Sequence, residues 1–217
     1  METLQKAFIC DWKNIIKRGA FGLLVPLLSG LYPILNRYNP NARVLTTFID
    51  NRIPFNKYFI IFYVIWYGYV AFFIIYFCIF DKEYYWKILL SISLGFITAY
   101  IIFYFFPTTV PRPTLSGDDI FTDMVRALYN HDNPFNCFPS IHVINTLLVQ
   151  LYVTINKNVN KILKIICNII GILIIISTMF IKQHVFLDAV SAAVIVWLLY
   201  LLMKYLLDDK GLVNKLF

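Results

Sequence analysis

Two of the three histidines in the sequence stand beside residue types that support nucleophilic or acid–base chemistry. Asp188 follows His184 by four residues, so on a helix both side chains would lie on one face. A carboxylate placed there can fix the tautomer of an imidazole and stabilise its cation. His142 follows Pro139 by three residues, and a proline suits the first turn of a helix. The pattern is typical of a nucleophilic histidine, His184, assisted by a second one, His142, that donates a proton.

Positively charged and hydrogen-bonding residues near these histidines could hold an anionic centre. Arg112 lies in a proline-rich segment, Lys182 precedes His184 by two residues, and Ser140 precedes His142 by two. Cations and the N–H groups at a helix N-terminus stabilise an oxyanion during in-line displacement. The histidine–aspartate pair alone could equally be a hydrogen bond that fixes helix packing. With the cations, the set favours phosphoryl transfer, and no cluster in the sequence has the spacing of metal ligands.

The remaining candidate residues are interpreted as structural. His131 lies in a His-Asp-Asn-Pro segment, which is typical of a solvated turn. Asp118, Asp119 and Asp123 are expected in a solvated loop, with a helix cap among them. The loop from Asn39 to Lys57 is expected to lie on the surface and receives no role.

The elements that position the histidines are predicted to be membrane helices. Of the 217 residues, 60% are hydrophobic and 14% charged, and the mean hydropathy is +0.71. A soluble domain carries about a quarter charged residues and could not bury this much apolar surface. The composition therefore excludes a soluble enzyme and a disordered chain, and it predicts a single integral membrane domain over residues 1–217.

Six apolar runs are long enough to approach the 17–25 residues of a membrane-spanning helix. They are Gly19–Asn36, Tyr58–Phe80, Ile88–Phe106, Pro139–Ile155, Ile165–Ile181 and Val185–Met203. Residues 1–18 are expected to form an interfacial amphipathic helix with Leu4, Phe8, Trp12, Ile15 and Ile16 on one face. The predicted fold is all-α: this helix, a six-helix transmembrane bundle over residues 19–207, and a cytoplasmic tail over residues 208–217.

The distribution of Lys and Arg predicts the orientation of the bundle. With both termini in the cytoplasm, twelve basic residues lie inside and seven outside, as the positive-inside rule favours. The net charge of +7 is then explained by this bias and by anionic lipid headgroups rather than by nucleic acid. In this orientation Arg112, His142 and His184 all lie at the outer end of the bundle. The Ile, Lys, Asn and Tyr content indicates a low-GC bacterium, and so a plasma membrane.

This set of residues resembles the three signatures of the phosphatidic acid phosphatase type 2 superfamily, the membrane relatives of vanadium haloperoxidases. Residues 139–142 match the second signature, P-S-x-H, and residues 177–188 follow the third, S-R-x5-H-x3-D. The first, K-x6-R-P, is represented by Arg112 and the proline after it. Phe105 stands where the first signature has lysine, and Thr178 where the third has arginine. These departures are more similar to the sphingolipid phosphotransferase branch than to the common phosphatases.

The resemblance implies that His184 attacks phosphorus to form a phosphohistidine, with Asp188 orienting its ring. His142 would protonate the leaving alkoxide and then activate the acceptor. The residues expected to bind the phosphoryl oxygens are Arg112, Ser140 and Lys182, and no cofactor is expected.

The expected function is a lipid-phosphate phosphatase whose substrate and surrounding partners are membrane lipids of the outer leaflet. Two alternatives stay open. A lipid phosphotransferase would use the same site but pass the phosphoryl headgroup to an alcohol instead of water. A non-catalytic lipid-binding or transport protein would explain the two family cations that are missing.

Overall fold

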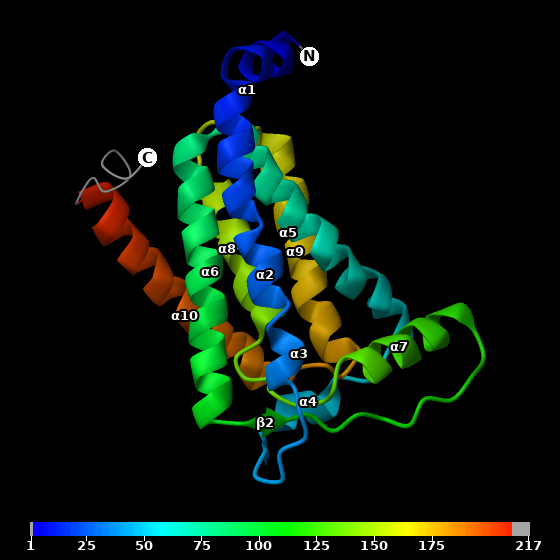
Figure 1. Cartoon of the computed structure of the whole chain (residues 1–217). Helices are drawn as coiled ribbons and strands as arrows, with labels where there is room; N and C mark the ends of the chain where they lie inside the picture. The colour runs from blue at the N-terminus through cyan, green and yellow to red at the C-terminus, as the bar shows by residue number, and fades with distance from the viewer. Residues whose placement is uncertain (1, 210–217) are drawn as a thin grey trace.

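The computed structural model describes residues 2–209, with side chains from residue 12 to residue 207. The long helices α5 (Ile60–Phe80), α6 (Lys82–Phe105), α9 (Lys161–Phe180) and α10 (Phe186–Met203) surround the shorter α8 (Ile141–Ile155) (Figure 1). A π-helical turn, η2 (Lys204–Asp209), follows α10. The all-α fold class is confirmed, since the strands β1 (Arg43–Val44) and β2 (Thr108–Thr109) form only one short parallel pair.

In the part of the chain that the structure describes, five stretches are long and apolar enough to cross a membrane, which indicates an integral membrane protein. They are Trp12–Leu35, Lys57–Phe80, Lys82–Phe105, Lys161–Phe180 and Phe186–Leu207. The sixth expected span is α8, whose 15 residues reach only about 22 Å, short of a hydrocarbon core of about 30 Å. Six spans are therefore not confirmed. Most side chains of α8 are buried because the other helices enclose it.

The N-terminal segment differs from the expected boundary between an interfacial helix and a first span. Helix α1 (Glu2–Gly22) continues past Arg18. The guanidinium of Arg18 donates to Cys78 O at 3.1 Å, and the carbonyl oxygen of Arg18 accepts from Tyr85 Oη at 2.6 Å. These bonds give the arginine polar partners against α5 and α6. Within the described part of the chain the candidate span covers Trp12–Leu35, so it includes residues before Gly19.

The face expected for the interfacial helix is only partly described. Ile15 is buried, whereas Trp12 and Ile16 are exposed, so these three residues do not share one environment. The side chains of Leu4 and Phe8 lie outside the described residues, as do residues 210–217 of the expected tail. The interfacial position of residues 1–18 stays a prediction.

Two short helices continue α1 along the bundle. Helices α2 (Leu24–Ser29) and α3 (Tyr32–Leu35) follow one another beside α6, and each contains a proline (Figure 1). Proline lacks a backbone N–H donor and therefore interrupts a helix, which is consistent with the division of this part of the chain into short helices. The result is a stepped wall that leads from the start of the chain to the loop-bearing end of the bundle.

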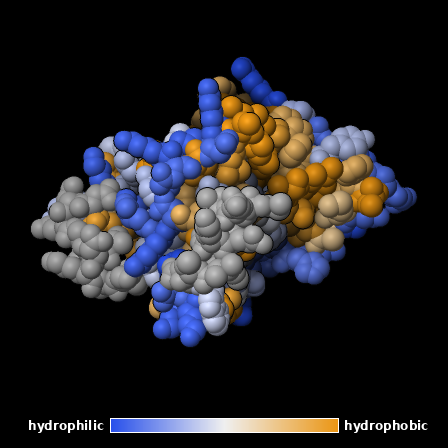
Figure 2. Space-filling view, turned by 90° about the horizontal axis from the view of Figure 1, so that it is seen from above, coloured by the Kyte–Doolittle hydropathy of each residue, from blue (hydrophilic) through white to orange (hydrophobic). Residues whose placement is uncertain are grey.

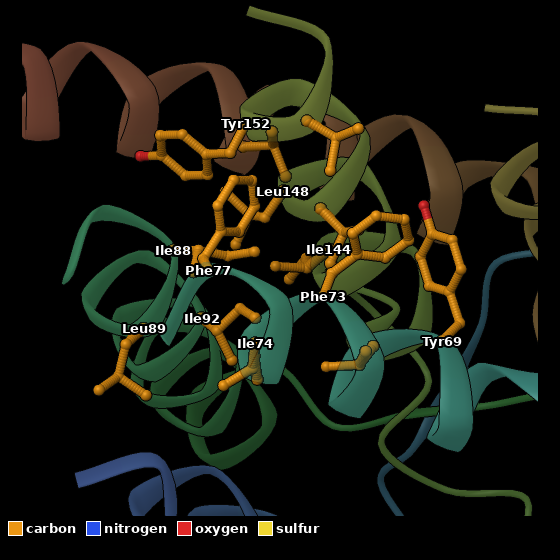
Figure 3. Packing of buried hydrophobic residues seen from close by; sticks show 14 of the residues in the cluster. Tyr69, Phe73, Ile74, Phe77, Ile88, Leu89, Ile92, Ile144, Leu148 and Tyr152 are labelled. Carbon is orange, nitrogen blue, oxygen red and sulfur yellow. The ribbon is translucent and has the colours of Figure 1, made fainter. Parts of the chain in front are cut away.

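The core joins α5, α6 and α8 through interlocking aromatic and aliphatic side chains. Figure 3 shows Phe73 and Phe77 of α5 beside Ile88 and Ile92 of α6 and the α8 residue Leu148. Their burial removes apolar surface from contact with solvent and fixes the three helices together.

Glycines permit the closest helix contacts of this core. A Cβ atom added to Gly95 would lie 2.8 Å from Ile144 Cγ2, and one added to Gly171 would lie 2.6 Å from the Gln150 side chain. Small residues at helix interfaces allow close backbone approach in membrane bundles. Both contacts centre on α8, so glycine helps to hold the helix that begins with the candidate site.

The connecting segments at one end of the bundle form the platform of the site. This end carries α4 (Phe48–Arg52), η1 (Lys57–Phe59), β2 and α7 (Ile120–His131) (Figure 1). Thr108 of β2 accepts backbone hydrogen bonds from Cys137 and Phe138 through its hydroxyl, both at 3.0 Å. These two bonds hold the residues just before α8 in place. The opposite end of the bundle is seen in Figure 2, where hydrophilic side chains gather beside a hydrophobic area.

Candidate active site

His184 lies against Asp188 at the start of α10. Its Nδ1 is 3.1 Å from Asp188 Oδ2 and 3.0 Å from the carbonyl oxygen of Cys137. Both neighbours are acceptors, so Nδ1 carries the hydrogen and Nε2 keeps its lone pair in the neutral ring. His184 itself precedes the first helical residue, Phe186. The expected pairing on one helix face is therefore replaced by a contact at the helix N-terminus, where Asp188 Oδ2 also accepts from Val185 N at 3.0 Å.

His142 faces His184 from the first turn of α8. The centroids of the two imidazole rings are 5.9 Å apart. The His142 ring packs against Tyr63, at 4.4 Å between centroids, and Trp66, at 4.2 Å. Its Nε2 is buried and has no hydrogen-bond partner among the described residues. The arrangement leaves a proton-transferring nitrogen available beside His184.

Arg112 reaches the histidines through the residue next to His184. Its guanidinium donates to Gln183 Oε1 and, at 3.3 Å, to the carbonyl oxygen of Tyr129. It also lies 4.3 Å from the centre of the Tyr129 ring, a cation–π contact. Burial raises the pKa of Tyr129 to about 12, and its hydroxyl donates to Ile181 O at 2.7 Å. Tyr129 thus ties α7 to the end of α9 and supports the arginine.

Lys182 lines the same cavity as Arg112 and His184. Its Nζ donates to the carbonyl oxygens of Ile53, at 2.5 Å, and Asp50, at 3.2 Å. Two carbonyls leave one of its three N–H donors for another acceptor. Burial lowers the pKa of Lys182. Its φ of 52° lies in the left-handed region, where a non-glycine residue is uncommon.

Ser140 acts as the cap of α8. Its side chain is fully buried and its Oγ accepts from Val143 N at 3.3 Å. Its backbone N–H donates to the carbonyl oxygen of Asp188 at 3.3 Å, which links the start of α8 to α10. This bond brings the helix that carries His142 next to the helix that begins after His184.

Two cavities meet at His184. The first, of about 210 Å³, is lined by His142, His184 and Asp132, and we call it the histidine cavity. The second, of about 320 Å³, is lined by Arg112, Lys182 and His184 and is called the cationic cavity. Ser140 lines neither of them. The imidazole of His184 therefore stands between a space with a second histidine and a space with two cations.

The two positions that depart from the family signatures do not line these cavities. Phe105 is 77% exposed at the end of α6. Thr178 is buried in α9, where its hydroxyl donates to Ile175 O at 2.8 Å. Its carbonyl accepts the backbone N–H groups of Gln183 and His184, so Thr178 shapes the turn that presents the candidate nucleophile.

Asp132 is a site residue that sequence reasoning missed. Its Oδ1 accepts from Asn36 Nδ2 at 2.6 Å and from Tyr32 Oη at 3.1 Å, and it lines the histidine cavity. Burial raises the pKa of Asp132, against the opposing effect of Arg112 and His184. In the sequence Asp132 is simply an acidic residue next to His131, and this position does not predict its contacts with Tyr32 in α3 and Asn36 at the end of α3.

Asp50 was also missed, because the loop from Asn39 to Lys57 had received no role. It is buried, and its Oδ1 accepts from Phe186 N at 2.7 Å, which caps α10 from a distant segment. Its Oδ2 accepts from Thr47 N at 2.7 Å and so caps α4 as well. This loop therefore forms a wall of the cationic cavity.

Of the three acidic residues expected in a solvated loop, Asp118 is exposed there and Asp119 supplies the expected helix cap, whereas Asp123 lies within α7. Asp119 caps α7 by accepting from Phe121 N at 3.1 Å, and Lys57 bonded to it lowers the pKa of its carboxyl. Asp123 pairs with Arg126 on the exposed face of α7. His131 is exposed, but it ends α7 instead of lying in a turn.

The arrangement can perform nucleophilic displacement at an anionic centre. It contains an oriented imidazole, a second imidazole with an unpaired nitrogen, and two cations beside the first ring. Among the side chains described, those of residues 12–207, there is no group of three or more His, Cys, Asp or Glu that could hold a metal ion.

Comparison with known proteins gives a family but no individual counterpart. No curated protein and no solved structure matches the chain. The sequence pattern of the PAP2 superfamily matches residues 40–202, a stretch that includes Arg112, both facing histidines and Asp188. Because this match covers most of the 217 residues, the chain belongs to the PAP2 superfamily.

Proposed function

We propose that the protein is a membrane phosphatase that hydrolyses lipid phosphate monoesters through a phosphohistidine on His184. Membership of the PAP2 superfamily suggests a phosphatase-type activity on phosphate monoesters. The observation that carries the proposal is the fixed imidazole of His184, with Nδ1 held by two acceptors, facing the unpaired Nε2 of His142. The lipid substrate is supported by the position of this pair at the end of an apolar helical bundle.

In the first step the Nε2 lone pair of His184 attacks phosphorus and the bond from phosphorus to the alkyl oxygen breaks. His142 gives its proton to the leaving alkoxide, which departs as an alcohol. Asp188 stabilises the positive charge on the phosphorylated imidazole through Nδ1. Arg112 and Lys182, from the cationic cavity, hold the phosphoryl oxygens as the charge on them rearranges.

In the second step the now neutral His142 removes a proton from water. The water oxygen attacks phosphorus, the P–N bond breaks, and inorganic phosphate and free His184 are formed. Ser140 contributes by capping α8, which keeps His142 at the mouth of the site. This function requires no cofactor.

The principal test compares phosphate release from a lipid phosphate by the wild type, His184→Ala and Lys157→Ala. We expect His184→Ala to lose turnover, because the nucleophile is absent, and Lys157→Ala, on an exposed position between α8 and α9, to retain it. A radiolabel that is acid-labile and alkali-stable should be trapped on the wild type when turnover is quenched. Wild-type turnover in His184→Ala would refute the assignment. Saturable lipid binding without phosphate release from any substrate would instead favour a non-catalytic binding or transport protein.

A phosphotransferase is the second candidate. Its support is that Phe105 and Thr178 replace the cations of the usual signatures, although the family match provides no evidence for the sphingolipid branch. The first step would be the same, and an alcohol would replace water in the second. Product analysis with added diacylglycerol or another lipid alcohol separates the two, because transfer yields a new phosphate ester instead of inorganic phosphate.

The proposal places the site at the outer face of a bacterial plasma membrane, with both termini in the cytoplasm. It is supported by the twelve basic residues on one side against seven on the other. Ser116→Cys and Lys157→Cys place thiols on exposed residues at opposite ends of the bundle, in a Cys10→Ser background. A membrane-impermeant thiol reagent should label position 116 in intact cells and spare position 157. The reverse result would invert the topology.

A further inference from the structure

An apolar groove adjoins the histidine cavity. The groove encloses about 570 Å³ between α1–α2 and α5, and Trp66, Tyr67 and Phe96 line both spaces. Leu23, 68% exposed, and Ile75, 57% exposed, line the groove and open it to the surroundings of the bundle. A substrate with a polar head at the histidines could therefore continue into the membrane along this groove.

Asn145 is a polar residue in the wall of this apolar groove. It is 1% exposed, and neither its Nδ2 nor its Oδ1 has a hydrogen-bond partner among the described residues. It lies three residues after His142 on α8, about 4.5 Å deeper along the helix axis. A buried amide without a partner is unfavourable, and polar groups inside membrane helices are commonly functional.

Trp66 carries a second unpaired group at the junction of the two spaces. Its Nε1 is buried and has no partner in the described part of the chain. Asn145 offers two N–H donors and one acceptor, and Trp66 adds a donor. The junction is therefore rich in donors, so it matches a ligand with acceptor oxygens close to its phosphate.

Resting on the lipid phosphatase function above, we propose that Asn145 and Trp66 form a subsite for an ester carbonyl of a diacylglycerol-type lipid phosphate. In such a lipid the ester groups are a few bonds from phosphorus, beyond which only acyl chains follow. With phosphorus at His184, where the two cavities meet, a carbonyl lies at the depth of Asn145 and one acyl chain enters the groove. A prenyl phosphate has no acceptor after its phosphate and leaves the amide unpaired.

The dimensions of the groove agree with this occupant. Its lining residues on α5 run from Trp66 to Ile79, which is about 20 Å along a helix. One leaflet contributes about 15 Å of hydrocarbon to the bilayer, so the groove can follow an acyl chain over its leaflet.

The test measures kcat/KM of wild type and Asn145→Leu on phosphatidate, on farnesyl phosphate and on water-soluble p-nitrophenyl phosphate. Leucine keeps the approximate size of asparagine but cannot hydrogen-bond. We expect kcat/KM for phosphatidate to fall by about tenfold or more, since an ester carbonyl loses its donor. Farnesyl phosphate and p-nitrophenyl phosphate should be hydrolysed as well as before.

Two further variants test the subsite and the groove separately. Trp66→Phe removes Nε1 but keeps an aromatic ring, and it should lower the phosphatidate to farnesyl phosphate ratio in the same direction. Ala71→Trp fills the groove from an exposed position and should impair both lipids but spare p-nitrophenyl phosphate. Val194→Trp, on an exposed position of α10, is the matched control.

The outcomes separate the subsite from the proposed function. An unchanged phosphatidate to farnesyl phosphate ratio in Asn145→Leu overturns the subsite, provided that the wild type hydrolyses a phosphate ester. A wild type that hydrolyses none of the three substrates refutes the phosphatase itself. If Asn145→Leu does not fold, the ratio measured for Trp66→Phe decides, and no change there overturns the subsite.

Discussion

The histidine cavity and the cationic cavity share His184 but differ in charge and in the segments that build them. The cationic cavity is formed by the loops around Arg112, Lys182 and Asp50. The histidine cavity has a wall from α3, through Tyr32, and joins the apolar groove beside α1 and α2. One side of the imidazole therefore suits an anion, and the other leads toward hydrocarbon.

The family match also distinguishes the two cavities. It begins at residue 40, so it includes every cation of the cationic cavity but none of α1, α2 or α3. Arg112 and Lys182 thus lie within the shared pattern, whereas one wall of the groove lies before it. The comparison shows that both cations of the cationic cavity lie within the family pattern, whereas the α1–α2 wall of the groove precedes it and the α5 wall lies within it.

Removing the acid of the histidine cavity should have the largest effect. His142→Asn is expected to slow turnover by about 10²–10⁴, the usual contribution of general acid–base catalysis. Lys157→Asn, on an exposed position between α8 and α9 and away from both cavities, should retain wild-type turnover. Steady-state phosphate release measures both, and equal rates for the two variants would remove His142 from the mechanism.

Loss of a cation from the cationic cavity should have the next largest effect on turnover, and the size of this effect should not depend on the lipid tail of the substrate. Arg112→Ala is expected to lower kcat/KM by about 10²–10³, the usual effect of removing one oxyanion-stabilising donor from an enzyme. Arg112→Lys should restore little of it, because an ammonium cannot reproduce the planar guanidinium that stacks on Tyr129. The loss should be equal for lipid and water-soluble phosphates. A loss seen only with lipid substrates would show that Arg112 recognises the lipid and not the phosphoryl group.

A packing change far from both cavities should affect stability and leave the substrate preference intact. Gly171→Ala is expected to be less stable than Gly68→Ala by about 1 kcal/mol, since its Cβ would push the Gln150 amide away from its hydrogen bond to Asn168 O. Gly68→Ala is the matched control, because its Cβ meets nothing within 4 Å and alanine favours a helix by about 1 kcal/mol. Unfolding in detergent measures both changes. Equal stabilities would show that the α8–α9 contact is not tight.

The smallest expected effect is a pH dependence at the α3 wall of the histidine cavity. Burial raises the pKa of Asp132, so the protonated form favours the fold below the ordinary carboxyl pKa. That contribution is lost as the pH rises through the raised pKa. Asp132→Asn keeps an acceptor for Asn36 and Tyr32 but removes the titration. Its unfolding midpoint should therefore depend less on pH over this range, and an unchanged dependence would exclude Asp132 as the cause.

Local spacing was sufficient to identify most of the apolar runs, the contact between His184 and Asp188, and a helix start close to Pro139, although His184 lies just before α10 and not within it. These features depend on residues close in sequence, whose relative positions are limited by helix geometry and capping. The short length of α8 could not be recognised in the same way, because a 15-residue apolar helix becomes tolerable only when neighbouring helices enclose it.

The walls of the cavities depended on contacts between distant segments. Asn36 meets Asp132 across 96 positions, Asp50 meets Phe186 across 136, and Arg112 meets Gln183 across 71. No periodicity connects such pairs, because each is created when separate loops pack against the same end of the bundle. The amino-acid order thus specifies which groups can do chemistry, and the packed helices specify which of them share a cavity, since hydrogen bonds and burial depend on distance in space.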